Sequence, residues 1–262
     1  MKELIRAEVL KLSRSLGYRV LLLCALCVGL LMGGAFILLA NIEFGYRGYG
    51  GSPGGFMMDI FGMNGHFVYI NALSDLQVPA ILISVFAALF VSSEFGNRTH
   101  ALGIQNGCTR QGILLAKAIV FLVGVLPLVF TIPFVSALTM SIFEGFGTPL
   151  NAETLLGLIQ YTALFFLGHI TLASICFLLA ILTKNVIGTI GAGVGIFLTL
   201  GFLSQLATFL ESVESVMRFI FVHQLGQLPN LESIPMFLFG CIAFGTGALA
   251  LAFDNFQKAD LA

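Results

Sequence analysis

The chain has 262 residues, of which 58% are hydrophobic and only 10% are charged, and its formal net charge is −1. Its mean hydropathy of +1.02 lies far above that of a soluble domain. A charge so close to zero argues against nucleic acid as a partner. Composition therefore predicts a membrane protein.

The N-terminal residues 2–17 combine basic and apolar positions in a helical rhythm. Ile5, Val9, Leu12 and Leu16 recur at spacings of four, three and four, which places them on one face of a helix. We predict an amphipathic helix that lies along the membrane surface with its basic residues near anionic lipid. The alternative is a short basic lead-in that only enforces topology.

Six charge-free windows follow, and each has about the length that a helix needs to cross a bilayer, roughly 20 residues. Backbone polar groups cannot stay unpaired in lipid, and no window alternates strictly as a β-barrel strand does, so helices are expected. We predict one all-α membrane domain of six spans, residues 1–262, with an alternative of five spans in which the fifth segment is re-entrant. The predicted spans are about 18–41, 76–93, 113–143, 155–183, 186–208 and 233–253.

Basic residues set the orientation of these spans. All of the twelve Lys and Arg residues except Arg47 and Arg218 fall on one side, which is therefore cytoplasmic and holds both termini. They are Lys2, Arg6, Lys11, Arg14, Arg19, Arg98, Arg110, Lys117, Lys184 and Lys258. The segments 42–75 and 209–232 become outer loops, and the second of these is expected to contain a short helix or a re-entrant hairpin.

Several residues within the spans are candidates for packing or gating. Gly29–Gly33 and Gly191–Gly195 have G-x-x-x-G spacing, which favours close helix packing within one subunit, with a subunit interface as the alternative. Pro127 and Pro133 can kink the third span. His169, in the fourth span, is an intramembrane ionisable group and so a candidate by default, although a neutral His bonded to a neighbouring helix is the favoured interpretation. These last three are the cavity or gating candidates.

The segment 94–117 concentrates polar residues between the second and third spans. Its candidate site residues are Glu94, Arg98, Thr99, His100, Gly107, Arg110 and Lys117. A cytoplasmic loop of this kind is where a transport permease would receive force from a partner ATPase, and the alternative is an ordinary solvated loop. We expect Glu94 to pair with Arg98, one helical turn later, or with the N-terminal surface helix.

This segment resembles ABC-2 type transporter permeases, the exporter family that includes bacitracin-resistance, lantibiotic-immunity and related peptide-export subunits. The residues that carry the resemblance are Glu94-Phe95, Asn97, Thr99, Gly107, Thr109-Arg110 and Ile113–Lys117. Family members commonly show E-F-x-N-G-T, then G-x-S-R and a hydrophobic stretch ending in Lys. Here Arg98 replaces the usual Gly, and Ala101 stands where a basic residue is common. The expected topology matches the family over nearly the whole chain.

The resemblance implies an exporter subunit in the plasma membrane of a bacterium, paired with a second permease, identical or homologous, and with two cytoplasmic ABC ATPase subunits. Residues 94–112 would form the coupling loop, and Arg98, His100 and Arg110 would contact the ATPase. ATP and Mg would bind the partner, since this chain has no G-x-x-x-x-G-K-[ST] motif and no other catalytic motif. A cavity with hardly any charge suits an amphipathic or hydrophobic cargo, such as an antimicrobial or other peptide or a lipid-like molecule. The alternative function is a non-transport membrane scaffold or regulatory subunit.

Overall fold

The computed structural model describes residues 1–41, 64–96, 107–207, 217, 220–226 and 234–258. Within these residues 91% are helical and none lies in a strand, which confirms the predicted helical class. The elements are α1 (Lys2–Arg14), α2 (Leu16–Asn41), α4 (Gly65–Ser74), α5 (Gln77–Ala87), the π-helix η1 (Ala88–Ser92), α6 (Ser93–Gly96), α8 (Arg110–Glu144), α9 (Ala152–Thr183), α10 (Val186–Ala207), α12 (Phe221–Gly226) and α13 (Ile234–Lys258).

Six helical stretches are long and apolar enough to cross a membrane, so the chain is a multi-pass membrane protein. They are Leu16–Leu38, Gln77–Gly96, Arg110–Glu144, Ala152–Thr183, Val186–Ser204 and Ile234–Lys258. The second joins α5, η1 and α6 end to end. The fifth lies in α10, a single helix of 22 residues, which is long and apolar enough to cross a membrane and favours six spans over the re-entrant alternative.

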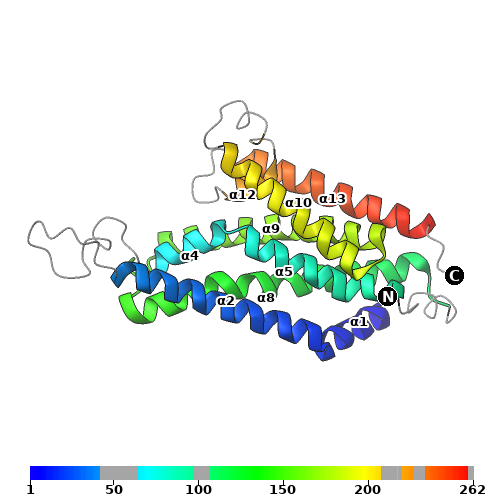
Figure 1. Cartoon of the computed structure of the whole chain (residues 1–262), viewed down its shortest axis with the longest axis horizontal. Coiled ribbons are helices and arrows are strands. Elements are labelled where there is room, and N and C mark those ends of the chain that lie inside the picture. Colours follow the sequence, from blue (N-terminus) through cyan, green and yellow to red (C-terminus); the bar gives the residue numbers. More distant parts are fainter. Residues whose placement is uncertain (42–63, 97–106, 208–216, 218–219, 227–233, 259–262) are drawn as a thin grey trace, which may run out of the picture.

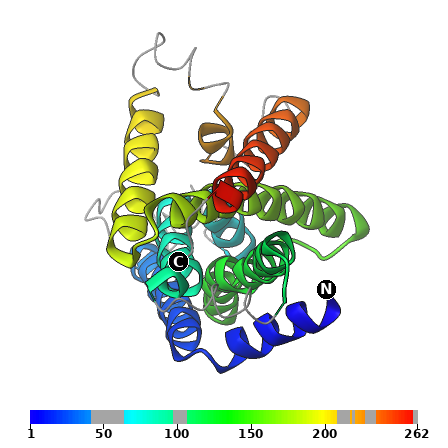
Figure 2. The ribbon, with the colours of Figure 1, turned by 90° about the vertical axis from the view of Figure 1, so that its right-hand side faces the viewer.

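The long helices run along the longest axis of the molecule, and α9 lies between α8 and α13 (Figures 1 and 2). α2 packs along α8, and α10 packs along α5. The second, third and fourth spans are 67%, 56% and 67% buried inside the chain, whereas the first, fifth and sixth are 22%, 22% and 28% buried. The three central spans therefore form the core, and the other three present most of their surface outward.

Glycine explains how closely α2 approaches α8. A Cβ on Gly33 would lie 2.8 Å from the backbone oxygen of Ser136, and one on Gly29 would lie 2.9 Å from Cβ of Val135. The first G-x-x-x-G pair therefore serves packing within the chain, as the favoured interpretation predicts. Around Gly191 and Gly195 no described atom lies within 4 Å of such a Cβ, so the second pair takes no part in that packing.

Part of the predicted outer loop 42–75 is helical, which the sequence did not indicate. The Asn64 side chain caps α4 by accepting a hydrogen bond from the backbone N–H of Phe67 at 2.9 Å. The backbone N–H of Gly65 donates to the carbonyl of Gly145 at 3.0 Å, which ties α4 to the connection between α8 and α9. The Gly-rich residues 45–63 lie outside the described part of the chain. In the other predicted outer loop, α12 supplies the short helix.

Asp75 separates α4 from α5 and gives a pH-dependent prediction. Burial raises its pKa above the ordinary value of 3.8, and hydrogen bonds from the backbone N–H groups of Gln77 and Val78 lower it by less. The folded protein therefore prefers the protonated acid, and ionisation costs stability as the pH rises from about 4 through the raised pKa. Asp75→Asn keeps an oxygen acceptor and cannot ionise. We expect its melting temperature (Tm) in detergent to exceed that of the wild type by about 2 °C at pH 7.

The same comparison below pH 4 should show a smaller difference, because a larger fraction of the wild-type acid is then protonated. Asp75→Ala, which removes the acceptor as well, is the control and should lower the Tm at both values. A lower Tm for Asp75→Asn at pH 7 would mean that the charge of Asp75 at the start of α5 outweighs its burial.

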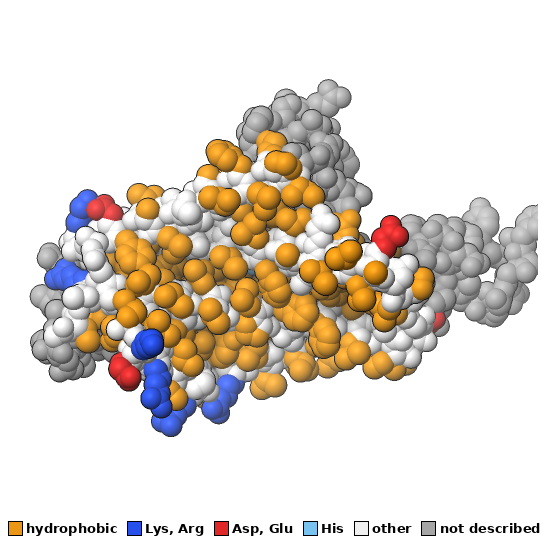
Figure 3. Space-filling view, turned by 180° about the vertical axis from the view of Figure 1, so that it is seen from behind, with side chains coloured by type: hydrophobic (Ala, Val, Ile, Leu, Met, Phe, Trp, Pro, Cys, Tyr) orange, Lys and Arg blue, Asp and Glu red, His pale blue; other side chains and the backbone are white. Residues whose placement is uncertain are grey.

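Basic side chains gather at the end of the molecule that carries α1, while hydrophobic side chains cover its middle (Figure 3). The N-terminus and the end of α13 lie at this same end (Figure 1). There Arg110 donates a hydrogen bond to the carbonyl of Gln257 at 3.0 Å, and the rings of Phe95 and Phe256 meet edge to face with centroids 6.1 Å apart. We call this the basic end.

Candidate functional site

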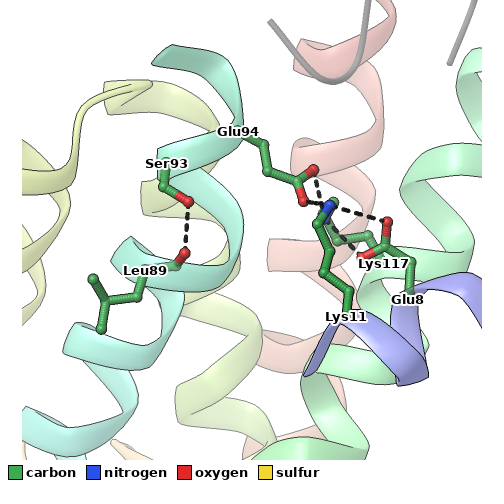
Figure 4. A network of polar contacts seen from close by, with 6 residues as sticks. All are labelled: Glu8, Lys11, Leu89, Ser93, Glu94 and Lys117. Carbon is green, nitrogen blue, oxygen red and sulfur yellow. Dashed lines mark hydrogen bonds and ion pairs between the residues drawn. The ribbon is translucent and has the colours of Figure 1, made fainter. Parts of the chain in front are cut away.

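Four charged side chains meet at the basic end and form a buried ion cluster: Glu8 and Lys11 from α1, Glu94 from α6 and Lys117 from α8 (Figure 4). The Lys117 ammonium lies 2.7 Å from Oε2 of Glu94 and 3.0 Å from Oε2 of Glu8. Lys11 also pairs with Glu94 and lies 3.8 Å from Oε1 of Glu8. Each carboxylate thus contacts both ammonium groups, and the four charges sum to zero.

The four side chains of the cluster are buried to different extents. The side chain of Lys117 is 0% exposed and that of Glu94 is 6% exposed, whereas Lys11 is 43% and Glu8 is 16% exposed. The Lys117 ammonium also lies 4.6 Å from the ring centroid of Phe90, in cation–π contact. A buried charge is costly unless it is paired, so Lys117 depends on its two carboxylates.

α1 reaches Lys117 where a glycine of α8 leaves room for an apolar side chain of α1. A Cβ on Gly124 would lie 3.0 Å from Cδ2 of Leu12. The Gly124 carbonyl accepts a hydrogen bond from the hydroxyl of Tyr18 at 2.9 Å, which holds the start of α2 at the same place. Gly124 therefore lets α1 lie close along α8, where Glu8 pairs with Lys117.

Glu94 is positioned by an irregular helix. The π-helix η1 directly precedes α6 and adds one residue per turn relative to an α-helix, an arrangement that is frequent at functional sites. Within η1 the Ser92 hydroxyl lies 2.6 Å from that of Thr189 in α10 and donates to the carbonyl of Ala180 in α9 at 3.3 Å. The segment that holds Glu94 is therefore bonded directly to two further spans.

The candidate residues from segment 94–117 fall into three groups. Glu94 and Lys117 join in the cluster, and the predicted pairing of Glu94 with the surface helix is confirmed by Lys11. Arg110 is the first residue of α8, and Gly107 precedes it with a left-handed φ of +83°. The remaining candidates, Arg98, Thr99 and His100, lie outside the described residues.

Two expectations for this segment need correction. The predicted loop 94–112 is shorter, because α6 extends to Gly96 and α8 begins at Arg110. Lys117 was a candidate coupling residue, but it is fully buried and therefore offers no surface to a partner in this conformation. Its two carboxylates explain why a cation tolerates that burial.

The surface helix also differs from its predicted form. It ends at Arg14, and Ser15 adopts an extended conformation before α2 begins. Ile5 and Leu12 pack against the core, but Val9 and Leu16 are 48% and 75% exposed. The face of α1 that meets α8 therefore differs from the predicted apolar face, since it includes Glu8. Apolar periodicity alone does not identify a charged residue on that face.

The gating candidates lie away from the cluster. α8 continues as one helix through Pro127 and Pro133. His169 is fully buried, and its Nδ1 lies 2.8 Å from the carbonyl of Phe165 one turn earlier in the same helix. The predicted bond to a neighbouring helix is therefore wrong. Its Nε2 has no hydrogen-bond partner among the described residues.

Glu8 and Lys11 belong to the ion cluster but were not among the site residues predicted from the sequence. The available signal was an acid, Glu8, in the middle of a helix rich in basic residues and three positions before Lys11. Comparison with known proteins adds no further member, since no protein-family model, curated protein or solved structure matches this chain. Among the described residues no group of three or more His, Cys, Asp or Glu side chains could hold a metal ion.

Proposed function

We propose that this chain is the membrane-spanning permease subunit of an ATP-binding cassette exporter of the ABC-2 type. The observation that carries the proposal is the ion pair between Glu94 and Lys117, which joins the helices on either side of residues 97–106. A force applied to that segment would pass to α1 through Glu8 and Lys11, and to α9 and α10 through Ser92. Rigid connections of this kind are what a coupling segment requires.

In this proposal the basic end faces the cytoplasm of a bacterial cell, and two ABC ATPase subunits dock there and bind ATP and Mg. The ATPase acts by binding two permease conformations with different affinity, and that difference drives the change between them. A second permease, identical or homologous, completes the transporter. The outward surface of α10, with open space beside Gly191 and Gly195, is our candidate for contact with it.

The cargo that we propose is amphipathic or hydrophobic, such as an antimicrobial or other peptide or a lipid-like molecule. Between the ion cluster and Asp75 the second span carries no charged residue, and the same holds for residues 118–143 and 154–183 in the other central spans. A strongly charged cargo would cross this region without any compensating charge, at a large cost in free energy.

Co-purification with candidate ATP-binding subunits from the same source tests this function. We expect the wild type to retain an ATPase, and Arg98→Glu and Arg110→Glu to reduce its recovery by about tenfold, the factor for a loss of about 1.4 kcal/mol of affinity. Lys184→Glu is the matched control, because this exposed Lys lies in the connection between α9 and α10 and should leave recovery unchanged.

The outcomes separate the two candidate functions. If both loop variants still bind the ATPase while Lys184→Glu does not, docking occurs at the α9–α10 connection. If no ATPase accompanies even the wild type, the exporter proposal fails and a membrane scaffold or regulatory subunit becomes the better description. Size-exclusion profiles of all variants establish that each is folded.

A further inference from the structure

The charged residues of α1 lie on two different faces of the helix, one inside the ion cluster and one outside it. Glu8 points toward α8 and is paired with Lys117, so its negative charge does not reach the outward surface of the helix. The outward surface keeps Lys2, Arg6 and Arg14, which are exposed and make no ion pair within the described residues, with Glu3 as the exposed acid. The face of α1 that lies against α8 thus has its charges balanced within the ion cluster, whereas the outward face has a positive net charge.

The outward cations are aligned with an apolar residue. Lys2, Arg6, Leu10 and Arg14 follow one another at intervals of four, so they form one row along the helix. Leu10 is 48% exposed within this row, the adjacent Val9 is also 48% exposed, and Leu16 at the start of α2 is 75% exposed. A row that mixes cations with exposed apolar side chains suits the boundary between lipid headgroups and acyl chains.

The position of α1 matches that boundary. The first membrane span begins at Leu16, only two residues after α1 ends, and the Arg19 guanidinium donates hydrogen bonds to the carbonyl of Ser13 at 3.2 and 3.0 Å. These bonds fix the bend between α1 and α2. The helix is therefore held where the first span enters the membrane, with its basic row turned away from α8.

We propose that the outward face of α1, here called the basic row (Lys2, Arg6, Leu10 and Arg14), is a binding surface for anionic phospholipids. The Lys and Arg side chains contact the headgroup phosphates, and Leu10 with Val9 and Leu16 contacts the adjoining acyl chains. The proposal needs only the membrane location of the chain and stands whether or not the chain transports a cargo.

The absence of Trp from the sequence allows a direct test in the full-length protein. Leu10→Trp places a single fluorophore in the basic row, and the protein is reconstituted in nanodiscs with brominated phosphatidylglycerol or brominated phosphatidylcholine at the same mole fraction. Bromine quenches Trp on contact. We expect an apparent preference of about fivefold for the anionic lipid, the factor that one basic side chain near an anionic surface supplies. High salt should reduce it.

Two controls locate the effect. Adding Arg6→Gln and Arg14→Gln, which removes the cations four residues before and after Leu10, should lower the preference, whereas adding Lys184→Gln and Lys258→Gln should leave it unchanged. Phe239→Trp reports a side chain of α13 that is 75% exposed and should be quenched equally by both lipids. Equal quenching of Leu10→Trp, or a preference that survives loss of both Arg residues, overturns the proposal. Quenching by neither lipid also overturns it and points to a protein partner on this face.

Discussion

Lys117→Met is expected to lower the Tm of the protein in detergent by about 10 °C. Methionine fills nearly the same volume, so the main loss is the ammonium group that lies 2.7 Å from Glu94 and 3.0 Å from Glu8. Breaking a buried ion pair by removing one partner costs about 3–5 kcal/mol, because the other charge stays buried without compensation. In a chain of this size each kcal/mol corresponds to roughly 2–4 °C.

The double variant Glu94→Gln with Lys117→Met is the test of mechanism. It removes one charge of each sign and leaves Glu8 and Lys11 as a second, neutral pair, so it should be more stable than Lys117→Met alone by about 1–3 kcal/mol. Lys11→Gln, at the exposed side of the cluster, should cost no more than about 1 kcal/mol. With the three free cysteines that are not buried, Cys24, Cys27 and Cys108, replaced by Ser, a thiol-reactive dye that reports the buried Cys176 and Cys241 follows unfolding in all four proteins. Equal melting of Lys117→Met and Lys11→Gln would show that burial of the cluster adds nothing.

The number of spans followed from the sequence because hydropathy alone determines which segments can enter a bilayer. Long charge-free windows leave few alternatives when every backbone group must be bonded within its own helix. The short helix α4 was not predicted, because its position depends on contacts with a distant part of the chain, such as the backbone hydrogen bond between Gly65 and Gly145. The π-helix η1 carries no clear sequence signal either.

The site was predicted only in part for a related reason. Glu94 and Lys117 stood out as charges at the edges of apolar runs, but Lys is almost always exposed, so nothing about Lys117 alone indicated that it would be fully buried. Its burial requires Glu8 to arrive from a helix 109 residues earlier in the chain. Pairings across that separation depend on how the helices pack, which the periodicity of a single helix does not determine.

The second large loss of stability is expected at Gly33, where α2 packs against α8. Gly33→Leu is expected to lower the Tm by about 5–10 °C, because its Cβ would lie 2.8 Å from both the backbone oxygen of Ser136 and Cβ of Thr139. A backbone atom within α8 cannot move aside as a flexible side chain can, so α2 must shift away from α8. Overpacking of this kind costs about 1–3 kcal/mol or more, and here it acts along the whole contact between the two helices.

Gly34→Leu is the matched control, since it changes the adjacent residue in the same helix. No described atom lies within 4 Å of a Cβ at Gly34, and replacing Gly by Leu within a helix is intrinsically favourable, so its Tm should equal or slightly exceed that of the wild type. Size-exclusion and thermal melting in the same detergent compare the two variants. If Gly34→Leu were the damaging change and Gly33→Leu were tolerated, α2 would face α8 with its other side, and the first G-x-x-x-G pair would be free to form a contact between subunits.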